Sequence, residues 1–361
     1  MRVLIANDKF KGSLTAAEAA TAIKNGLPDG TEVDFCPIAD GGEGFTSTMM
    51  AALGGKVIEV DSVDALHRPV KAHFGLTDDG LAVMEMASTN GFEQIAADDR
   101  DIMRSSTYGT GLLLLEAKRA GAKRILIGLG GSATNDGGVG MAAALGVDFL
   151  DKNEDDLAAN PAELVHRLEQ VDLDGLATLP PIHVACDVTN PLLGDLGATA
   201  IFGPQKGATA EDQVVLERFL TQLRDVLGMA DLAKVPGAGA AGGLGFGLLA
   251  FGGAELASGF DLVAEATSLA DRIVAADLVI TGEGALDAQS LGGKGPVGVA
   301  RLAHTAGKPC WAVAGKINPE IHSAALFEKT YALAETGLPL EDLMNQAGPL
   351  LTKGVQRLSQ E

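Results

Sequence analysis

The feature that most constrains this chain is an alternation of strand-like apolar runs with helical patterns at both ends of the sequence but not in its middle. Near the N-terminus, strand-like runs at 2–6 and 32–39 alternate with helical patterns at about 15–26 and 44–53, and another apolar run follows at 56–60. Strands that are joined by helices lie parallel, because each crossover returns the chain to the same end of the sheet. The N-terminal segment therefore predicts a β-α-β-α-β unit with a parallel sheet.

The middle of the chain breaks this pattern, and the C-terminal part resumes it. Within 70–86, two alternating runs flank an Asp79-Gly80 pair, which is a hairpin signal. The alternation of strands and helices then returns, with strands expected at 277–282, 309–315 and 329–334. The topology thus leaves the parallel sheet and comes back to it.

These patterns predict an α/β protein with two α/β domains. Residues 1–68 and 272–361 form a discontinuous doubly wound domain with a parallel sheet of the Rossmann or flavodoxin-like kind, and residues 69–271 form an inserted, mixed α/β domain. At 361 residues with 47% apolar content, the chain is long enough for two cores. Ligands often bind between such domains, so we expect the active site in the cleft between them.

Composition excludes several classes of protein. A net charge of −21 disfavours a nucleic-acid partner, which would require a concentrated basic surface. The start of the chain lacks a secretion signal, and no apolar run reaches the roughly 18–20 residues of a membrane span, so we expect a cytoplasmic protein. Cys36, Cys186 and Cys310 stand singly in apolar stretches, which favours buried reduced thiols over zinc or disulfides.

Glycine-rich clusters carry most of the polar residues that could act on a ligand. The chain has 47 glycines, several of them grouped just after predicted strands, where backbone amides can surround an anion. The first cluster, 8–13, opens a helix whose N–H groups and dipole favour a phosphate or carboxylate. The second, 39–44, holds two carboxylates that could bind magnesium or substrate hydroxyls, or could simply begin a helix.

The third cluster follows a buried strand and supports the strongest rival interpretation. Gly128-x-Gly130-x-x-Ala133, with Asp151 about twenty residues further on, mimics a dinucleotide-binding fingerprint. In that motif the helix begins within the glycines, whereas residues 135–138 delay it here. An NAD-dependent hydroxy-acid dehydrogenase therefore stays an alternative, and a non-enzymatic nucleotide-binding sensor is another.

Three further segments combine glycine with reactive side chains. Asp187 follows a buried strand with Asn190 nearby, a pairing suited to orienting a hydroxyl or a metal, although an Asx turn explains it equally well. Lys294 stands among glycines just before Pro296, as a phosphate-binding lysine would, yet the chain has no Walker-type motif. Residues 105–111 open an apolar helix, where hydroxyls and amides could hold a substrate carboxylate or merely cap the helix.

Longer segments of the chain carry a family resemblance. They are DKFKGSLTA, ADGGEG, GLGGSATNDGG, CDVTNPLLG, FGPQKGA, PGAGAAGG and TGEGALDAQSLGGKGPVGVA. In this order, and along nearly the whole chain, they resemble the bacterial glycerate kinases of the first type. The resemblance implies two α/β domains and phosphorylation of D-glycerate by ATP with magnesium, with 2-phosphoglycerate favoured as product. The chain departs from the family at Asn7, Lys9 and Ala285, where Pro, Ser and often Arg are usual.

These observations together define the expected site. The expected catalytic residues are Asp187, as base or hydroxyl-orienting group, and Lys294. The residues expected to bind substrate are Asp8, Lys11, Asp40, Ser106, Thr107, Asn135, Asp136 and Asn190. Those expected to hold phosphate or nucleotide are Gly12, Ser13, Gly130, Gly131, Ser132, Lys206, Gly282 and Gly284. The expected magnesium ligands are Asp40, Glu43 and Asp287. D-glycerate and ATP are the expected partners, no nucleic acid or membrane is expected, and a homo-oligomer stays open.

Overall fold

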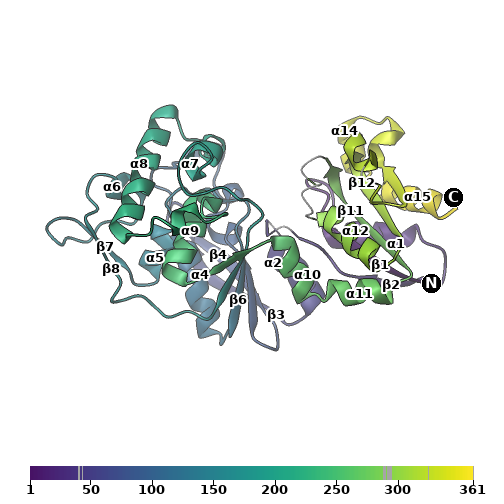
Figure 1. Ribbon diagram of the computed structural model, residues 1–361, viewed down its shortest axis with the longest axis horizontal. Coiled ribbons are helices and arrows are strands. Elements are labelled where there is room, and N and C mark those ends of the chain that lie inside the picture. The colour runs from purple at the N-terminus through teal and green to yellow at the C-terminus, as the bar shows by residue number, and fades with distance from the viewer. Residues whose placement is uncertain (40, 43, 288–289, 291–294, 324, 361) are drawn as a thin grey trace. The chain divides into compact units, whose positions relative to one another are not determined.

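The computed structural model describes residues 1–39, 41–42, 44–287, 290, 295–323 and 325–360. Contacts among the described residues divide the chain into two units. The first contains Met1–Asp40, Ala51–Leu53 and Phe260–Glu361, and the second contains Gly41–Met50 and Gly54–Gly259 (Figure 1). The domain organisation predicted from the sequence stays a prediction, and each unit is treated below by itself.

The first unit is built on a parallel sheet. Over the described residues this sheet has five strands in the order β13-β12-β11-β1-β2, and every neighbouring pair is parallel. The strands are β1 (Arg2–Asn7), β2 (Glu32–Phe35), β11 (Leu278–Leu286), β12 (Cys310–Ile317) and β13 (Lys329–Ala332). Strand order reverses between β1 and β11, which confirms the predicted doubly wound arrangement.

Helices cover both faces of this sheet because its central strands are apolar on both sides. Val3 and Ile5 of β1 pack in one cluster with residues of α1 (Ala16–Asn25) and α15 (Ala347–Gln360). Leu4 and Ala6 point the other way and pack with α11 (Leu269–Ala275) and α12 (Gly295–Thr305). The other helices of this unit are α10 (Gly259–Ala266), α13 (Pro319–Ser323) and α14 (Leu340–Asn345).

The second unit is built on a mixed sheet, as predicted. In the part of the chain that the structure describes, it has six strands in the order β10-β9-β6-β5-β4-β3. The strands are β3 (Lys56–Val63), β4 (Pro69–Leu76), β5 (Leu81–Glu85), β6 (Arg124–Gly128), β9 (Ile182–Ala185) and β10 (Glu255–Ala257). The four strands from β5 to β10 in the sheet are parallel, and the β4–β5 hairpin predicted at Asp79-Gly80 is confirmed.

One strand assignment from the sequence is wrong. The run 56–60 was expected in the first, parallel sheet, but it belongs to β3, which pairs antiparallel with β4. The turn between them explains the difference, since the buried carboxylate of Asp64 accepts hydrogen bonds from the amides of Leu66 and Arg68 and from Arg68 Nε. The half-exposed, alternating side chains of β3 also suit an antiparallel edge strand.

The core of the second unit lies between its sheet and a group of helices. Phe74, Met84 and Ile127 of the sheet pack in one cluster with Leu113 and Phe246 of two of these helices. The helices of this unit are α2 (Phe45–Leu53), α3 (Ala87–Asn90), α4 (Tyr108–Arg119), α5 (Val139–Ala144), α6 (Pro161–Leu164), α7 (Ala198–Phe202), α8 (Ala210–Leu227) and α9 (Ala240–Gly252). The strands β7 (Asp148–Leu150) and β8 (Gln170–Asp172) pair separately.

Two further expectations concern thiols and membranes. The prediction of reduced buried thiols is confirmed for Cys36 and Cys310, whereas Cys186 is half-buried. Burial raises the pKa of the Cys310 thiol to about 12. None of the described helices combines the length and the apolar character that crossing a membrane requires.

Candidate active site

Parallel strands bring several of the predicted residues to one edge of the second unit. β5, β6, β9 and β10 run in the same direction, so the segments that follow them share the carboxyl edge of the sheet. Ligands of open α/β sheets bind at this edge. The segments begin after Glu85, Gly128, Ala185 and Ala257.

Close backbone packing explains the glycines after β6. The amide of Gly130 donates to the carbonyl of Gly41 at 3.1 Å. A Cβ on Gly128 or on Gly130 would collide with the backbone of Gly41 and Gly42, so only glycine permits this approach. The helix that follows, α5, begins only at Val139, so the loop lacks the direct turn into a helix that a dinucleotide fingerprint requires.

The rest of this loop keeps polar groups without partners. The amide of Ala133 donates to Asn90 and the carbonyl of Gly131 accepts from Phe92, but across the described residues no hydrogen bond uses the amides of Gly131 or Ser132 as donors. The side-chain oxygens Thr134 Oγ1 and Asn135 Oδ1 are buried and also lack a described partner. Buried polar groups are nearly always satisfied, so the two buried oxygens suit a bound polar ligand, whereas the amide of the exposed Gly131 is accessible to water as well as to a ligand.

Lys206 lies beneath the same loop. It ends the short helix η3 (Pro204–Lys206), its residue is 3% exposed, and its Nζ donates to Ser132 Oγ and to the carbonyl of Thr134, both at 2.7 Å. Burial lowers the pKa of Lys206 to about 7, and the nearby charge of Asp136 acts in the opposite direction. The loop therefore has a buried amine close to its unpartnered groups.

Asp136 is buried and accepts hydrogen bonds from two segments of this region. Its carboxylate accepts from the amide and the hydroxyl of Thr107 at 2.7 and 2.8 Å, and from the amides of Gly138 and Gly140, both at 3.1 Å. Burial raises the pKa of Asp136, and these hydrogen bonds oppose the shift. These bonds tie the start of α4 to the start of α5, and the predicted contact of Asp136 with substrate stays a prediction.

Two predicted hydroxyls are likewise engaged within the protein. Thr107 Oγ1 donates to Asp136 and accepts from the amide of Met141 at 2.9 Å, and Ser106 Oγ donates to the carbonyl of Ala159 at 3.2 Å. Both residues are buried. Their predicted contact with a substrate carboxylate stays a prediction, for which this geometry offers no support.

Asp187 reaches the carboxyl edge directly after β9. Its Oδ1 accepts from the amide of Gly259 at 3.2 Å and lies 3.5 Å from the hydroxyl of Ser258, both of which follow β10. The side chain is half-buried. Asn190 instead orders its own loop, since its Nδ2 donates to the carbonyl of Leu196 at 2.8 Å.

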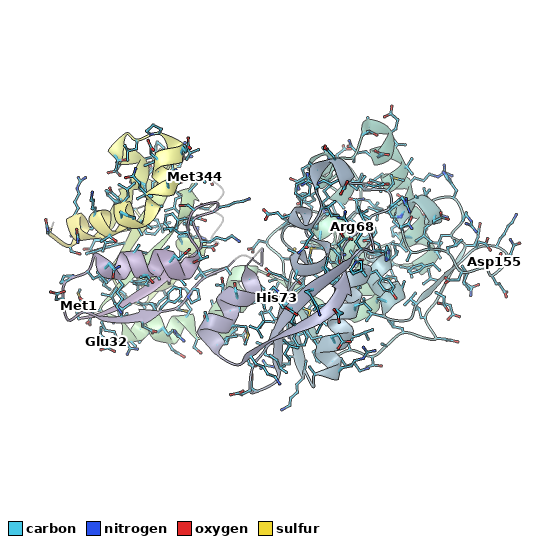
Figure 2. The ribbon with its side chains drawn as sticks, turned by 180° about the vertical axis from the view of Figure 1, so that it is seen from behind. Met1, Glu32, Arg68, His73, Asp155 and Met344 are labelled. Carbon is cyan, nitrogen blue, oxygen red and sulfur yellow. The ribbon has the colours of Figure 1, made fainter. Side chains whose placement is uncertain are left out.

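Two buried residues at this edge were missed from the sequence. Glu85 ends β5, and its Oε2 accepts a hydrogen bond from the amide of Phe45, at the start of α2, at 2.9 Å. His73, which is labelled in Figure 2, has its Nε2 at 3.9 Å from Glu85 Oε1. Asn90 bonds both the carbonyl of Ser106 and the amide of Thr110. An acid that directly ends a buried apolar run is a signal that could have identified Glu85, but no spacing marks Asn90.

In the first unit, side chains near the turn after β1 make several hydrogen bonds within the protein, while Asn7 Oδ1 at the end of β1 is buried without a described partner. Asp8 Oδ1 accepts from the amide of Lys9 at 2.6 Å, and Ser13 Oγ donates to the carbonyl of Met344 at 2.6 Å. Thr15 and Glu18 form a reciprocal capping box at the start of α1. The capping box pairs the amides of Thr15 and Glu18, and the expectation that this helix start favours an anion stays a prediction. Lys11 and Gly12 are exposed, and their predicted ligand contacts stay predictions.

The end of β11 brings two carboxylates close to one serine. Ser290 Oγ donates to Glu283 Oε1 at 3.0 Å, and the amide of Ser290 donates to Asp287 Oδ1 at 3.3 Å. β11 extends to Leu286, so Gly282 lies inside the strand, as expected, and Gly284 also lies inside it and not beyond its predicted end at residue 282. Their predicted phosphate contacts stay predictions.

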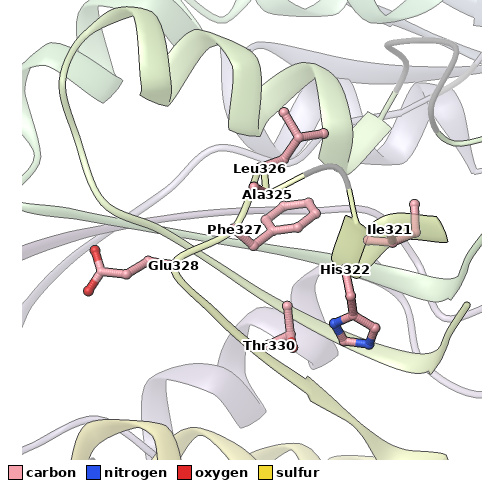
Figure 3. Close-up of a pocket in the computed structure, with 7 residues that line it drawn as sticks. All are labelled: Ile321, His322, Ala325, Leu326, Phe327, Glu328 and Thr330. Carbon is pink, nitrogen blue, oxygen red and sulfur yellow. The ribbon is translucent and has the colours of Figure 1, made fainter. Parts of the chain in front are cut away.

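Three predicted residues, Asp40, Glu43 and Lys294, fall outside the described residues. Over the residues that are described, no group of three or more His, Cys, Asp and Glu side chains is arranged to hold a metal ion. A pocket of about 190 Å³ in the first unit contains none of the predicted site residues (Figure 3). It is lined by Ile321, His322, Ala325, Leu326, Phe327, Glu328 and Thr330.

Comparison with known proteins gives consistent matches along the chain. The model of the Glycerate kinase family matches residues 3–361. A glycerate 2-kinase from Escherichia coli is 44% identical over 332 residues, which cover 89% of this chain and 87% of that protein. A glycerate kinase from Bacillus subtilis is 40% identical over 98% of this chain and 95% of its own length. The crystal structure of a putative glycerate kinase 2 from Salmonella typhimurium LT2 superimposes with a TM-score of 0.89 at 39% identity, covering 100% of this chain and 97% of the other.

Proposed function

Because this chain belongs to the glycerate kinase family, we propose that it transfers the terminal phosphoryl group of ATP to the 2-hydroxyl of D-glycerate. The observation that carries this proposal is the match to a glycerate 2-kinase at 44% identity over 89% of the chain. The name of that relative supports 2-phosphoglycerate as the product. The reaction uses ATP, and we place the protein in the cytoplasm, where ATP is available.

Asp187 is the proposed group that receives the hydroxyl proton. The 2-hydroxyl oxygen attacks the γ-phosphorus, a new P–O bond forms, the bond to the β-phosphate oxygen breaks, and ADP leaves while the proton passes to the carboxylate. Asp187 suits this role because it stands half-buried at the carboxyl edge of the sheet and is oriented by the amide of Gly259. Phosphoryl transfer needs little more than such positioning and charge neutralisation.

The loop after β6 is the proposed site for a negatively charged group of the ligands. Its amides at Gly131 and Ser132 and the buried amine of Lys206 are donors suited to carboxylate or phosphate oxygens. Gly130 supports the loop from behind through its bond to Gly41. Asn135, whose buried Oδ1 lacks a described partner, is the proposed acceptor for a substrate hydroxyl.

The first unit supplies the proposed metal ligands. Glu283 and Asp287 offer oxygen donors at the carboxyl end of β11, next to the point where strand order reverses, and such hard oxygen ligands fit Mg²⁺. When bound, Mg²⁺ neutralises charge on the transferring phosphoryl group. Asp40 and Glu43 stay proposed as further ligands, and Lys294 as a phosphate contact.

The test is product identification with purified protein. The protein is incubated with ATP, Mg²⁺ and D-glycerate, ADP release is followed, and the product is identified by phosphorus NMR. L-glycerate and a hydroxy acid without a second hydroxyl serve as controls. We expect ADP release that depends on D-glycerate, with the phosphorus signal of 2-phosphoglycerate. A folded sample that binds ATP but releases no glycerate-dependent ADP would refute the proposed function, and 3-phosphoglycerate would correct its regiochemistry.

A further inference from the structure

Lys206 places an amine inside the second unit without an acidic side chain at hydrogen-bond distance. Its two described acceptors, Ser132 Oγ and the carbonyl of Thr134, are both uncharged oxygens. Burying an ammonium group without a paired charge is costly, and such lysines usually lose their proton instead. These surroundings therefore suit an uncharged amine better than a charged one.

The hydrogen-bond geometry fits a neutral amine. A neutral lysine has two N–H bonds, and the two acceptors satisfy both of them. An ammonium group has three N–H donors. Among the described residues no third acceptor lies within hydrogen-bond distance of Nζ, so the third N–H of an ammonium would need an oxygen from water or from a ligand.

The surroundings of the amine contain the other parts of a ligand site. The amides of Gly131 and Ser132 lack acceptors within the described chain, and Thr134 Oγ1 and Asn135 Oδ1 are buried without partners. Asn135 Nδ2 donates to Thr199 of α7 at 3.0 Å, which fixes the loop against the helix that precedes Lys206. The two amides are donors suited to an oxyanion, whereas Asn135 Oδ1 is an acceptor suited to a ligand hydroxyl. The amine of Lys206 bonds Ser132 and Thr134 of the same loop.

One charged group acts on this amine from the surrounding elements that the structure describes. Asp136, in the same loop, favours the protonated form, but it is outweighed by burial, which lowers the pKa of Lys206 to about 7. α7, which packs against η3, has no ionisable side chain between Ala198 and Phe202. At slightly alkaline pH the amine of the ligand-free protein is therefore mostly neutral.

We infer that Lys206 and the loop Gly131–Asn135 form an oxyanion site that takes up a proton from solvent when the oxyanion binds. The inference rests on the proposed function, which offers two oxyanions, the carboxylate of glycerate and a phosphate of the nucleotide. Binding converts the neutral amine to an ammonium, whose third N–H donates to the ligand oxygen. No covalent bond changes apart from this protonation.

Proton uptake makes affinity depend on pH. Above a pH of about 7, where the free amine is mostly neutral, the apparent Kd rises by up to about tenfold per pH unit, because each binding event must take a proton from solvent. Below that pH the amine is already protonated and the dependence disappears. With glycerate, whose carboxylate does not titrate in this range, a site built from permanent charges would show neither effect. Phosphate and ADP titrate near neutral pH themselves, so their proton uptake is compared with that of Lys206→Met.

The experiment is calorimetric titration of the whole protein in buffers with different ionisation enthalpies, at about pH 6 and about pH 8.5. D-glycerate, ADP and inorganic phosphate are titrated separately. We expect uptake of about one proton at the higher pH and little at the lower, with at least one of these ligands. Proton uptake with glycerate alone would show that the oxyanion at Lys206 is the substrate carboxylate. Uptake with ADP or inorganic phosphate would show that it is a phosphate group.

Variants separate the site from the fold. Lys206→Met should raise the Kd of the ligand that shows proton uptake by roughly 10- to 100-fold, as expected for losing a hydrogen bond to a charged group. It should also abolish the proton uptake. Lys234→Met, at an exposed lysine of the same unit, is the matched control and should behave like the wild type. The inference is overturned if the wild type shows no uptake with any of the three ligands, or if Lys206→Met takes up protons as before. Uptake in a protein that does not phosphorylate glycerate would refute the proposed function and leave the oxyanion site standing.

Discussion

The loop after β6 in the second unit and the turn after β1 in the first unit are both glycine-containing segments that follow a strand, but they differ in the burial of the lysine beside them. Both follow a buried parallel strand and contain glycine, but the turn after β1 has its own lysines, Lys9 and Lys11, whereas the lysine beside the β6 loop, Lys206, comes from η3. After β1, Ser13 and Thr15 bond within the protein, and the start of α1 is capped. After β6, the amides of Gly131 and Ser132 stay unpartnered and a lysine is buried beneath them. The amides of Lys11 and Gly12 also have no acceptor among the described residues, so the two segments differ in the burial of the lysine beside them and not in the presence of unpartnered amides.

The largest expected effect concerns Asp187, which shares the sheet edge with the β6 loop. Asp187→Asn should lower kcat by about 10²- to 10⁴-fold, the usual range for an acid–base group. Steady-state ADP release measures kcat. Asp148→Asn, which changes an exposed acid on β7, is the control. A wild-type kcat in a folded Asp187→Asn protein would remove Asp187 from the mechanism and weaken the assignment of chemistry to this edge.

Backbone packing gives the next largest contrast. Gly242 has φ +67° and its Cβ position lies 2.5 Å from Asn135 Cα, whereas Gly30 in the first unit has φ +78° with open space around it. Gly242→Ala should cost about 2–4 kcal/mol of unfolding free energy and disturb the β6 loop. Gly30→Ala should cost only about 1 kcal/mol, because only the backbone conformation is strained.

Chemical denaturation of both glycine variants measures this difference. Glycerate-dependent ADP release should fall in Gly242→Ala and stay unchanged in Gly30→Ala. Equal losses of stability in the two variants would show that packing against residues 134–135 adds nothing to the backbone strain.

A smaller effect follows from the buried amine in the ligand-free protein. The folded-state pKa of Lys206 is lowered from 10.5 to about 7, so between these values the unfolded chain binds more protons than the folded one. The unfolding free energy of the wild type should therefore rise with pH relative to Lys206→Met, by up to about 1.4 kcal/mol per pH unit. Below pH 7 the two curves should run parallel. Urea unfolding across this pH range measures the difference, and parallel curves throughout would contradict a neutral Lys206.

The smallest effect tests the capped helix start of the first unit. Thr15→Ala removes the N-cap side chain of α1 and should cost about 1 kcal/mol of unfolding free energy, with kcat and KM unchanged. Thermal unfolding and steady-state kinetics check both parts. A large rise in the KM for ATP would mean that this helix start contacts the nucleotide after all, and the contrast between the two turns would fail.

The sequence predicted the strands of the parallel sheet better than the point at which the chain passes from that sheet to the mixed one. Apolar runs separated by helical patterns correctly predicted the parallel strands β1, β2, β11, β12 and β13. β3 was expected in the parallel sheet because a strand that follows a helix usually returns to the same sheet as a parallel strand. Nothing in the local sequence pattern showed that Asp64 would close a hairpin between β3 and β4. Pairing partners depend on tertiary contacts that periodicity does not contain.

The site was predictable in its residue types but not in their roles. Lys206 and the glycines of the β6 loop stood out from the sequence, yet the loss of charge on Lys206 depends on burial that only the fold provides. Asp136 looked like a ligand for substrate, but its carboxylate is engaged by four donors from Thr107, Gly138 and Gly140 among the described residues. Whether a polar side chain faces a ligand or the protein interior depends on its hydrogen-bond partners, which spacing cannot specify.

The measurement that tests the central contrast most directly is amide hydrogen exchange with and without D-glycerate and ADP. We expect added protection in residues 129–137 when at least one of the ligands binds, because the unpartnered amides of Gly131 and Ser132 acquire acceptors. The amides of residues 15–18, at the capped start of α1, should keep the same exchange rates. Protection at 15–18 with none at 129–137 would contradict the account and place the anion site in the first unit.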